Sequence, residues 1–118
     1  MNIGNKGLAE VNLIIPQSTS LEFDVYHTDQ DGNEIDHTNS QIAMVFQKKR
    51  TKENIDLSFC CTGTESSIHV NIPAEVTTDL DISTQYVWDM IVTLISGSSV
   101  RLTYGSVQIV DTYALDGA

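Results

Sequence analysis

Cysteine, proline, basic residues and aromatic residues are all scarce in this sequence of 118 residues. The only cysteines are the adjacent Cys60 and Cys61, and neighbouring side chains on a strand point to opposite faces, so a disulfide between them would need a strained backbone. Structural zinc would need a second pair of ligands. We therefore expect two free thiols, one buried and one facing outward.

Long apolar runs are also missing. None approaches the about 20 residues that span a bilayer, and the N-terminus carries one lysine, Lys6, with no apolar stretch behind it. This is not the pattern of a secretory signal peptide, so we expect the chain to fold in a cytoplasm and to meet no membrane. The length predicts one domain, and 41% hydrophobic with 19% charged residues is typical of a globular protein.

Basic residues number six against sixteen acidic residues, which gives a net charge of −10. This charge repels phosphate backbones, so we expect no nucleic acid partner. Four of the six basic residues lie together, at Lys48, Lys49, Arg50 and Lys52. Such a run is usually the solvated end of a strand, and the alternative is a patch that docks on an acidic neighbour.

Alternation of apolar and polar residues recurs along the chain, whereas no segment keeps a helical period for three turns. The expected strands cover residues 11–15, 21–25, 42–46, 55–59, 68–72, 86–94 and 100–109. A single helical turn is expected after Pro73. This pattern predicts an all-β fold, a two-sheet antiparallel immunoglobulin-like sandwich of about seven to eight strands, with a small barrel as the alternative.

Turn signals and the chain ends complete the predicted organisation. The segment 96–99 is expected to be a hairpin turn, and a change in parity between Leu102 and Val107 predicts a bulge at Gly105. The domain is expected to cover residues 11–110, with a flexible N-terminal arm at residues 1–10 and a C-terminal tail at residues 111–118. Trp88 is expected to anchor the core in place of a sugar-stacking role.

The stretch HTDQDGNEIDHT, residues 27–38, gathers acidic residues and two histidines. Asp31-Gly32 is a preferred type I′ pair, so the stretch is interpreted as a hairpin turn. A calcium loop fits poorly, because His27 and Thr38 would occupy its first and last ligand positions. His27 and His37 could face each other across this hairpin, and we expect a solvated pair because two further metal ligands are missing. The calcium alternative would use Asp29, Asp31, Glu34 and Asp36.

Catalytic motifs are not found. No serine lies on a G-x-S-x-G turn and no glycine-rich loop precedes a helix, so we expect neither an enzyme nor a cofactor. A glycan-binding domain would use exposed aromatic residues such as Tyr26 or Tyr113, but aromatics make up only 7% of the chain. Function is then expected to lie in surfaces, where strand edges and chain ends contact other proteins.

Five segments of the chain stand out together: IPQSTSLEF (15–23), DGNEIDHT (31–38), IHVNIPAEVTTDL (68–80), YVWDMIVTL (86–94) and RLTYGSVQIV (101–110). In this order they resemble small structural proteins of tailed bacteriophages, a group that includes the immunoglobulin-like N-terminal domain of baseplate upper proteins. The resemblance covers residues 11–110 but carries no active-site motif. A P-G-x-Y entry expected before residue 86 is replaced by Ser83-Thr84-Gln85-Tyr86, and no counterpart of the extended C-terminal half is seen.

The resemblance implies a non-catalytic virion protein, associated with a tail or baseplate, that contacts other virion proteins as a homo-oligomer in a symmetric particle. A capsid decoration protein and a host-surface-binding or carbohydrate-binding domain are the alternatives. Ala43 and Val45, which are apolar between core positions, and the edge beside residues 68–72 are the expected contact regions. The full set of interface candidates is Ala43, Val45, Lys48, Lys49, Arg50 and His69.

Overall fold

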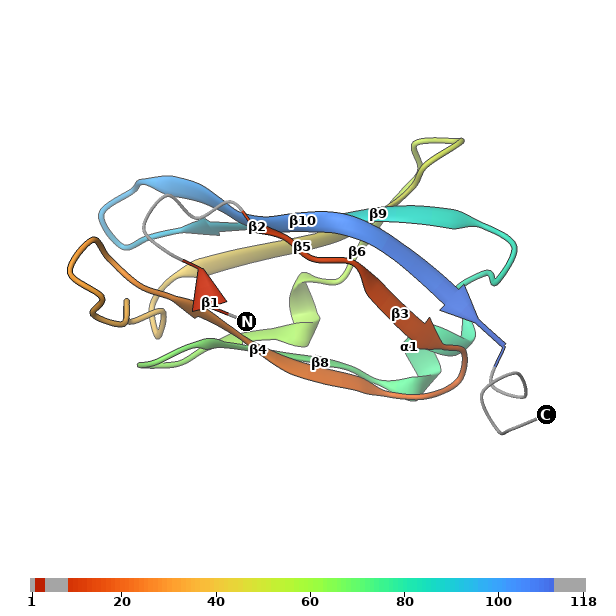
Figure 1. The fold of residues 1–118 in the computed structure, drawn as a ribbon, viewed down its shortest axis with the longest axis horizontal. Coiled ribbons are helices and arrows are strands. Elements are labelled where there is room, and N and C mark those ends of the chain that lie inside the picture. Colours follow the sequence, from red (N-terminus) through yellow and green to blue (C-terminus); the bar gives the residue numbers. More distant parts are fainter. Residues whose placement is uncertain (1, 4–8, 112–118) are drawn as a thin grey trace.

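The computed structural model describes residues 2–3 and 9–111, which form two β-sheets packed as two layers (Figure 1). The predicted immunoglobulin-like β-sandwich is confirmed. The four-stranded sheet has the order β1 (Asn2–Ile3), β4 (Leu21–His27), β8 (Ile68–Ile72), β7 (Cys61–Gly63). The six-stranded sheet has the order β2 (Ala9–Glu10), β10 (Ser99–Val110), β9 (Gln85–Thr93), β5 (Gln41–Lys48), β6 (Asn54–Asp56), and β3 (Leu13–Pro16) also pairs with β10.

The N-terminal segment departs from the antiparallel pattern. β1 pairs in parallel with β4 of one sheet, and β2 and β3 pair in parallel with β10 of the other. These strands are only two to four residues long, which is why alternation in the sequence indicated fewer strands. Within the expected arm, residues 2–3 and 9–10 are thus paired with the sheets. The expected tail lies outside the described residues except for Asp111.

The core lies between the sheets, where alternate residues of β4, β5, β8, β9 and β10 point inward. Trp88 is only 2% exposed, and its expected role as core anchor is confirmed. Its indole Nε1 donates a hydrogen bond to the Val11 carbonyl at 2.7 Å. The ring also meets Phe23 edge-on, with centroids 6.2 Å apart. Trp88 therefore joins the centre of β9 to the segment between β2 and β3 and to the opposite sheet.

Short helical turns connect the strands. The expected turn after Pro73 is confirmed as α1 (Ala74–Thr78), and Thr77 Oγ1 donates to the Thr19 carbonyl at 2.7 Å. The strand expected over residues 55–59 is wrong in its second half, because β6 ends at Asp56 and a 3₁₀ turn, η1 (Ser58–Cys60), follows. The Asp56 carboxylate accepts hydrogen bonds from the Ser58 amide and hydroxyl, at 2.9 and 2.6 Å. This local bonding competes with strand pairing.

The irregularity in β10 lies earlier than expected. The register against β9 shifts between Arg101 and Thr103, so Leu102 and Thr103 are both buried and Tyr104 turns outward. Gly105 is not the bulge residue. A Cβ atom at Gly105 would lie 1.9 Å from the Val11 carbonyl oxygen, so this glycine permits the close approach of the segment that holds Trp88.

The predicted hairpin between β9 and β10 is confirmed. The Gly97 amide donates to the Leu94 carbonyl at 2.8 Å, and the Leu94 amide donates to the Ser98 carbonyl at 2.8 Å. Gly97 has a φ of +95°, which is the left-handed conformation that glycine adopts without steric strain. The hairpin fixes the register of the two central strands of the larger sheet.

Candidate interaction surface

On the outer face of the six-stranded sheet, the three central strands carry little charge. Glu10 of β2 lies beside Tyr104 at one edge, and Asp56 of β6 lies beside Val45 at the other. Over β5, β9 and β10, the only charged side chains that face outward are Asp89 and Arg101, and they pair with each other. We call this surface the neutral face. Its outward residues are Gln41, Ala43, Val45, Gln47, Gln85, Val87, Asp89, Ile91, Thr93, Ser99, Arg101, Tyr104, Ser106 and Gln108.

Strand register sets the geometry at the centre of the neutral face. Ile91 of β9 lies between Ala43 of β5 and Arg101 of β10, and Asp89 lies between Val45 and Tyr104 in the next row. Arg101 Nε is 2.5 Å from Asp89 Oδ1. The guanidinium carbon also lies 4.9 Å from the centroid of the Tyr104 ring, a cation–π arrangement.

Apolar side chains surround this pair. A shallow depression of about 260 Å³ is lined by residues that include Ala43, Val45, Val87 and Ile91. Ile91 is 41% exposed, although it lies in the middle of a strand. An apolar centre with an arginine, a tyrosine and little charge has the composition of a protein interface. The structure thus places the predicted interface residues Ala43 and Val45 on the neutral face, and their contact with a partner stays a prediction.

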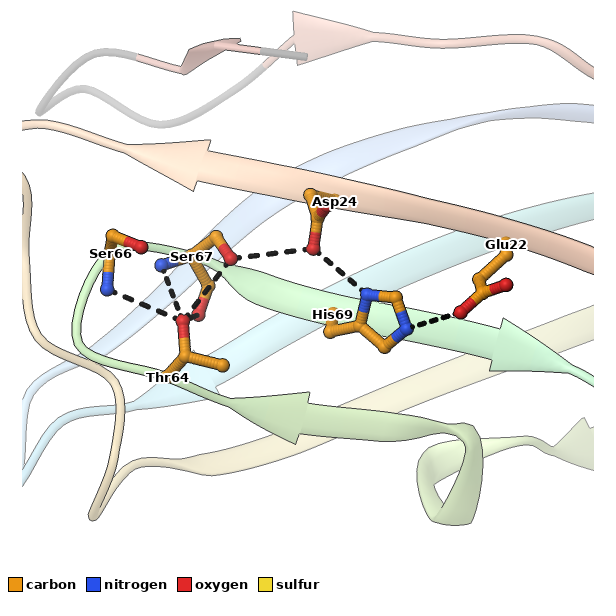
Figure 2. A network of polar contacts seen from close by, with 6 residues as sticks. All are labelled: Glu22, Asp24, Thr64, Ser66, Ser67 and His69. Atoms are coloured by element: carbon orange, nitrogen blue, oxygen red, sulfur yellow. Dashed lines mark hydrogen bonds and ion pairs between the residues drawn. The ribbon is translucent and has the colours of Figure 1, made fainter.

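The opposite face is charged. On the outer side of the four-stranded sheet, His69 of β8 lies between Asp24 and Glu22 of β4 (Figure 2). His69 Nδ1 is 2.9 Å from Asp24 Oδ1, and Nε2 is 2.8 Å from Glu22 Oε1. The His69 ring donates hydrogen bonds to these two carboxylates, and the bonds, the one to Asp24 first, raise the pKa of His69. The outward direction expected for His69 is confirmed, while its role as an interface residue stays a prediction.

Figure 2 shows that the cluster extends into the turn before β8. Ser67 Oγ donates to Asp24 at 3.4 Å, and Thr64 Oγ1 accepts the Ser67 amide at 2.9 Å. Residues 68–70 are not an edge, because β4 lies on one side of β8 and β7 on the other. The contact edge expected there is therefore wrong over those residues. Tyr26 lies on this sheet and is 36% exposed, and Tyr113 lies outside the described residues.

The basic run forms the turn between β5 and β6. Lys49 and Arg50 lie in this turn, and Lys52 adopts a φ of +63° while its amide donates to the Lys48 carbonyl at 2.8 Å. Lys48 Nζ lies 3.3 Å from Glu53 Oε2. The run is therefore the solvated end of a strand, as expected. Docking of an acidic neighbour there stays a prediction.

The acidic stretch forms a turn, but not of the expected type. Type I′ needs two residues with positive φ, and within residues 29–33 the structure has only Gly32, at +84°. The Gly32 amide donates to the Asp29 carbonyl at 3.1 Å, and the Asp29 amide donates to the Asn33 carbonyl at 2.9 Å. Asp29 Oδ1 also accepts the Asp31 and Asn33 amides, both at 2.9 Å. The Asp29 side chain thus stabilises the turn.

The calcium alternative named Asp29, Asp31, Glu34 and Asp36. The Asp36 carboxylate accepts the Thr38 amide at 2.8 Å, and Glu34 forms an isolated bridge with Thr28. Across residues 9–111, no group of three or more histidine, cysteine or acidic side chains is arranged to hold a metal ion. No described helix is long and apolar enough to cross a membrane.

His27 and His37 do face each other across the turn, but the expected solvation is wrong. His27 Nδ1 lies 3.1 Å from His37 Nε2, and His37 Nδ1 lies 3.0 Å from Ser40 Oγ. His27 is 2% exposed and His37 is fully buried. Burial lowers the pKa of both rings, and for His37 the second ring adds to the effect. Local sequence could not indicate this burial, because it depends on segments that are distant along the chain, such as Gly63, which lies against the backbone of His37.

The two cysteines are free, as predicted. Cys60 is buried, whereas Cys61 is half-buried and its Sγ lies 4.0 Å from Met44 Sδ, so it does not face fully outward. Burial raises the pKa of Cys61 to about 12 and also raises the pKa of Cys60. Thiolate is the reactive form of cysteine.

We therefore expect both cysteines to react slowly with iodoacetamide in the folded protein at pH 8, at least about tenfold more slowly than in guanidinium at a denaturing concentration. Intact-protein mass spectrometry over time would measure the two rates. An equal rate in the folded and unfolded protein would contradict the protonated state of the buried Cys60 and the half-buried Cys61.

Comparisons with known proteins identify no family for this chain. No protein-family model matches the sequence, and no curated protein matches it. Among solved structures, murine CRIg has a TM-score of 0.40 and 4% identity, covering 85% of this chain and 92% of that one. A family 123 glycoside hydrolase from Clostridium perfringens has a TM-score of 0.35 and 11% identity, covering 86% of this chain and 23% of that one. Neither likeness is close enough to indicate a function.

Proposed function

We propose that this protein is a non-catalytic structural component of a bacteriophage particle, associated with the tail or baseplate. It joins other virion proteins through protein contacts in a symmetric assembly, after folding in the host cytoplasm. The observation that carries the contact role is the neutral face, on a chain with a net charge of −10. The assignment to a phage particle is supported by the resemblance of residues 11–110 to phage structural proteins.

The charge distribution favours contact through one sheet. Removing water from charged groups is unfavourable unless each is paired, whereas apolar and neutral polar groups lose little. On the neutral face the only two charges over β5, β9 and β10, Asp89 and Arg101, are already paired, and a contact over these three strands leaves Glu10 and Asp56 at its borders. On the opposite face, contact would have to cover Glu22, Asp24 and His69. Burial of the neutral face therefore carries the smaller desolvation penalty.

A component of the phage tail should be recovered with purified phage particles. Particles purified from a lysate of the phage-producing bacterium are expected to contain the chain at a fixed ratio to the tail proteins, measured by quantitative mass spectrometry. After heads and tails are separated, the chain is expected with the tails. Recovery with the heads would favour the capsid decoration role, and absence from washed particles would contradict a virion role altogether.

A further inference from the structure

We propose that residues 28–40 act as an acid-sensitive latch, which the contact between His27 and His37 holds closed and which opens when both rings take up protons, while the two sheets stay folded. The segment connects β4 of one sheet to β5 of the other and lies at one end of the sandwich, where Figure 1 draws it in orange and yellow. Opening therefore changes the surface of that end. This device goes beyond the proposed contact role and does not depend on it.

The latch has one buried anchor. Within residues 28–40, His37 is the only buried residue, and the others are exposed or half-buried. The hydrophobic core between the sheets contains no side chain from this range. The flanking strands β4 and β5 pair with β8 and β9. The core and the strand pairing thus hold the sheets together without the segment, whereas the segment depends on the burial of one imidazole ring.

Few backbone contacts attach the segment. The Ile35 amide donates to the His27 carbonyl at 2.8 Å, and the His37 amide donates to the Thr64 carbonyl at 2.9 Å. Gly63 lies against the same stretch, because a Cβ atom on it would be 2.0 Å from the His37 carbonyl oxygen. Regions with few buried contacts open locally at a lower free energy than the whole fold. The segment can therefore leave Gly63 and Thr64 while the strands remain paired.

Protons oppose the closed state. Across the 3.1 Å contact, Nδ1 of His27 and Nε2 of His37 need one hydrogen between them, but both atoms carry hydrogens once both rings are charged. His37 Nδ1 lies 3.0 Å from Ser40 Oγ, which can accept its hydrogen, whereas the buried Nε2 atom of His27 has no hydrogen-bond partner within the described residues. In the open state water solvates both rings. Uptake of two protons thus favours the open segment.

The charged side chains around the pair do not offset its burial. The segment and the turn before β8 carry only carboxylates, which are Asp29, Asp31, Glu34, Asp36 and Glu65, and the β9–β10 hairpin turn carries no charge. Burial and then the second ring lower the pKa of His37, and Asp36 opposes them with a smaller effect. Burial also lowers the pKa of His27. Asp24 of β4 already bonds to His69, at 2.9 Å.

Opening alters the contacts available at this end. In the closed state, the segment and the β9–β10 hairpin turn line a depression of about 270 Å³, whose residues include Ile35, Ser40 and Ile95. Ile95 is 84% exposed. Release of the segment removes one wall of this depression and uncovers Gly63 and Thr64. A protein that binds this end in the closed state is therefore released at mildly acidic pH.

Amide hydrogen exchange in the full chain, followed by NMR, tests the latch. Protection of the Ile35 and His37 amides, relative to the unfolded chain at the same pH, is expected to fall at least about tenfold from pH 7 to pH 5.5, because each histidine contributes up to about tenfold per pH unit below about pH 6.5. Their exchange is expected to be insensitive to low guanidinium concentrations, since local opening exposes little surface, whereas exchange of the Met90 amide in β9 is accelerated. Equal protection of all three amides at both pH values, or protection of Ile35 and His37 that does not change with pH, would overturn the proposal.

Variants count the protons. His27→Gln leaves one titrating ring in the pair, so the change in protection is expected to fall from up to about a hundredfold to at most about tenfold per pH unit. Replacement of both His27 and His37 with glutamine is expected to abolish the change between pH 7 and pH 5.5. His69→Gln is the matched control, because it removes a histidine from the outer face of the four-stranded sheet, and it is expected to leave the change intact. If the double variant does not fold, His27→Gln decides: a slope as steep as in the wild type would overturn the proposal, as would a pH-dependent segment in a folded double variant.

Discussion

Replacing Gly105 with alanine is expected to lower the free energy of unfolding by about 3 kcal/mol, the upper part of the range for overpacked sites. The added Cβ would lie 1.9 Å from the Val11 carbonyl oxygen and 2.6 Å from its carbon. Val11 has little freedom to move, because its carbonyl accepts the Trp88 indole at 2.7 Å and its amide donates to the Tyr104 carbonyl at 2.8 Å. The substitution must therefore displace backbone, with its hydrogen bonds, from the edge of β10.

Guanidinium unfolding measures the loss of free energy of unfolding. Trp88 fluorescence gives a second signal, since the indole should lose its hydrogen bond to the Val11 carbonyl. Gly97→Ala is the control. Nothing lies within 4 Å of a Cβ at Gly97, so only its φ of +95° is penalised, at about 1–2 kcal/mol. Equal losses in the two variants, with unchanged Trp88 emission in Gly105→Ala, would mean that the segment at Val11 is not fixed.

Acidification is expected to destabilise the protein through His27 and His37. Burial lowers the pKa of both histidines in the folded chain, whereas both titrate near about 6.5 when unfolded. The unfolded state therefore binds more protons below that pH. Stability is complete above about pH 6.5 and is lost as the pH falls toward the folded pKa values, at up to about 1.4 kcal/mol per pH unit for each histidine.

The geometry explains why a proton is unfavourable at this site. The 3.1 Å contact between His27 Nδ1 and His37 Nε2 needs one donor and one acceptor. With both rings charged, two N–H groups would oppose each other in a buried site. His27 Nε2 is already buried without a hydrogen-bond partner among the described residues, so no acceptor within that part of the chain stabilises a proton there.

The measurement is the midpoint of guanidinium unfolding between pH 5 and pH 8. Replacing both His27 and His37 with glutamine is expected to flatten the decline below about pH 6.5. His69→Gln is the control, and it is expected to act in the opposite direction. The raised pKa of His69 gives stability that is present below about pH 6.5 and lost as pH rises through the folded pKa. Its replacement should therefore not flatten the decline below about pH 6.5. A wild-type midpoint that stays constant from pH 7 to pH 5 would contradict the role of the buried pair.

Much of the fold could be predicted from alternation alone. Along β8 and β9, buried side chains such as Val70 and Met90 alternate with side chains that face outward, so the sequence pattern indicates which residues are buried. The strand expected through Phe59 failed because Asp56 bonds locally to the next turn, and Phe59 is 71% exposed. Alternation also cannot reveal pairing in strands of two residues, such as β1 and β2.

The candidate surface was predicted only in part. Ala43 and Val45 stood out because apolar residues occupied both faces of one strand. Asp89 and Arg101 are 12 positions apart, and only strand register brings them together. Tyr104 has the same parity as the buried Leu102, and it turns outward because the register shifts before Thr103 rather than at Gly105. The signal in the sequence is a charged residue at an outward position of each of two consecutive strands. Asp89 lies between Trp88 and Met90, and Arg101 lies beside Leu102.

The edge strands of the two sheets have a consequence for aggregation. β6 and β7 are each three residues long, β3 ends at Pro16, and β4 carries Glu22 and Asp24. Edge strands that are short, end at a proline or carry charged side chains are poor templates for intermolecular β-sheet pairing. At high protein concentration, copies of this sandwich are therefore expected to resist growing into cross-β fibrils.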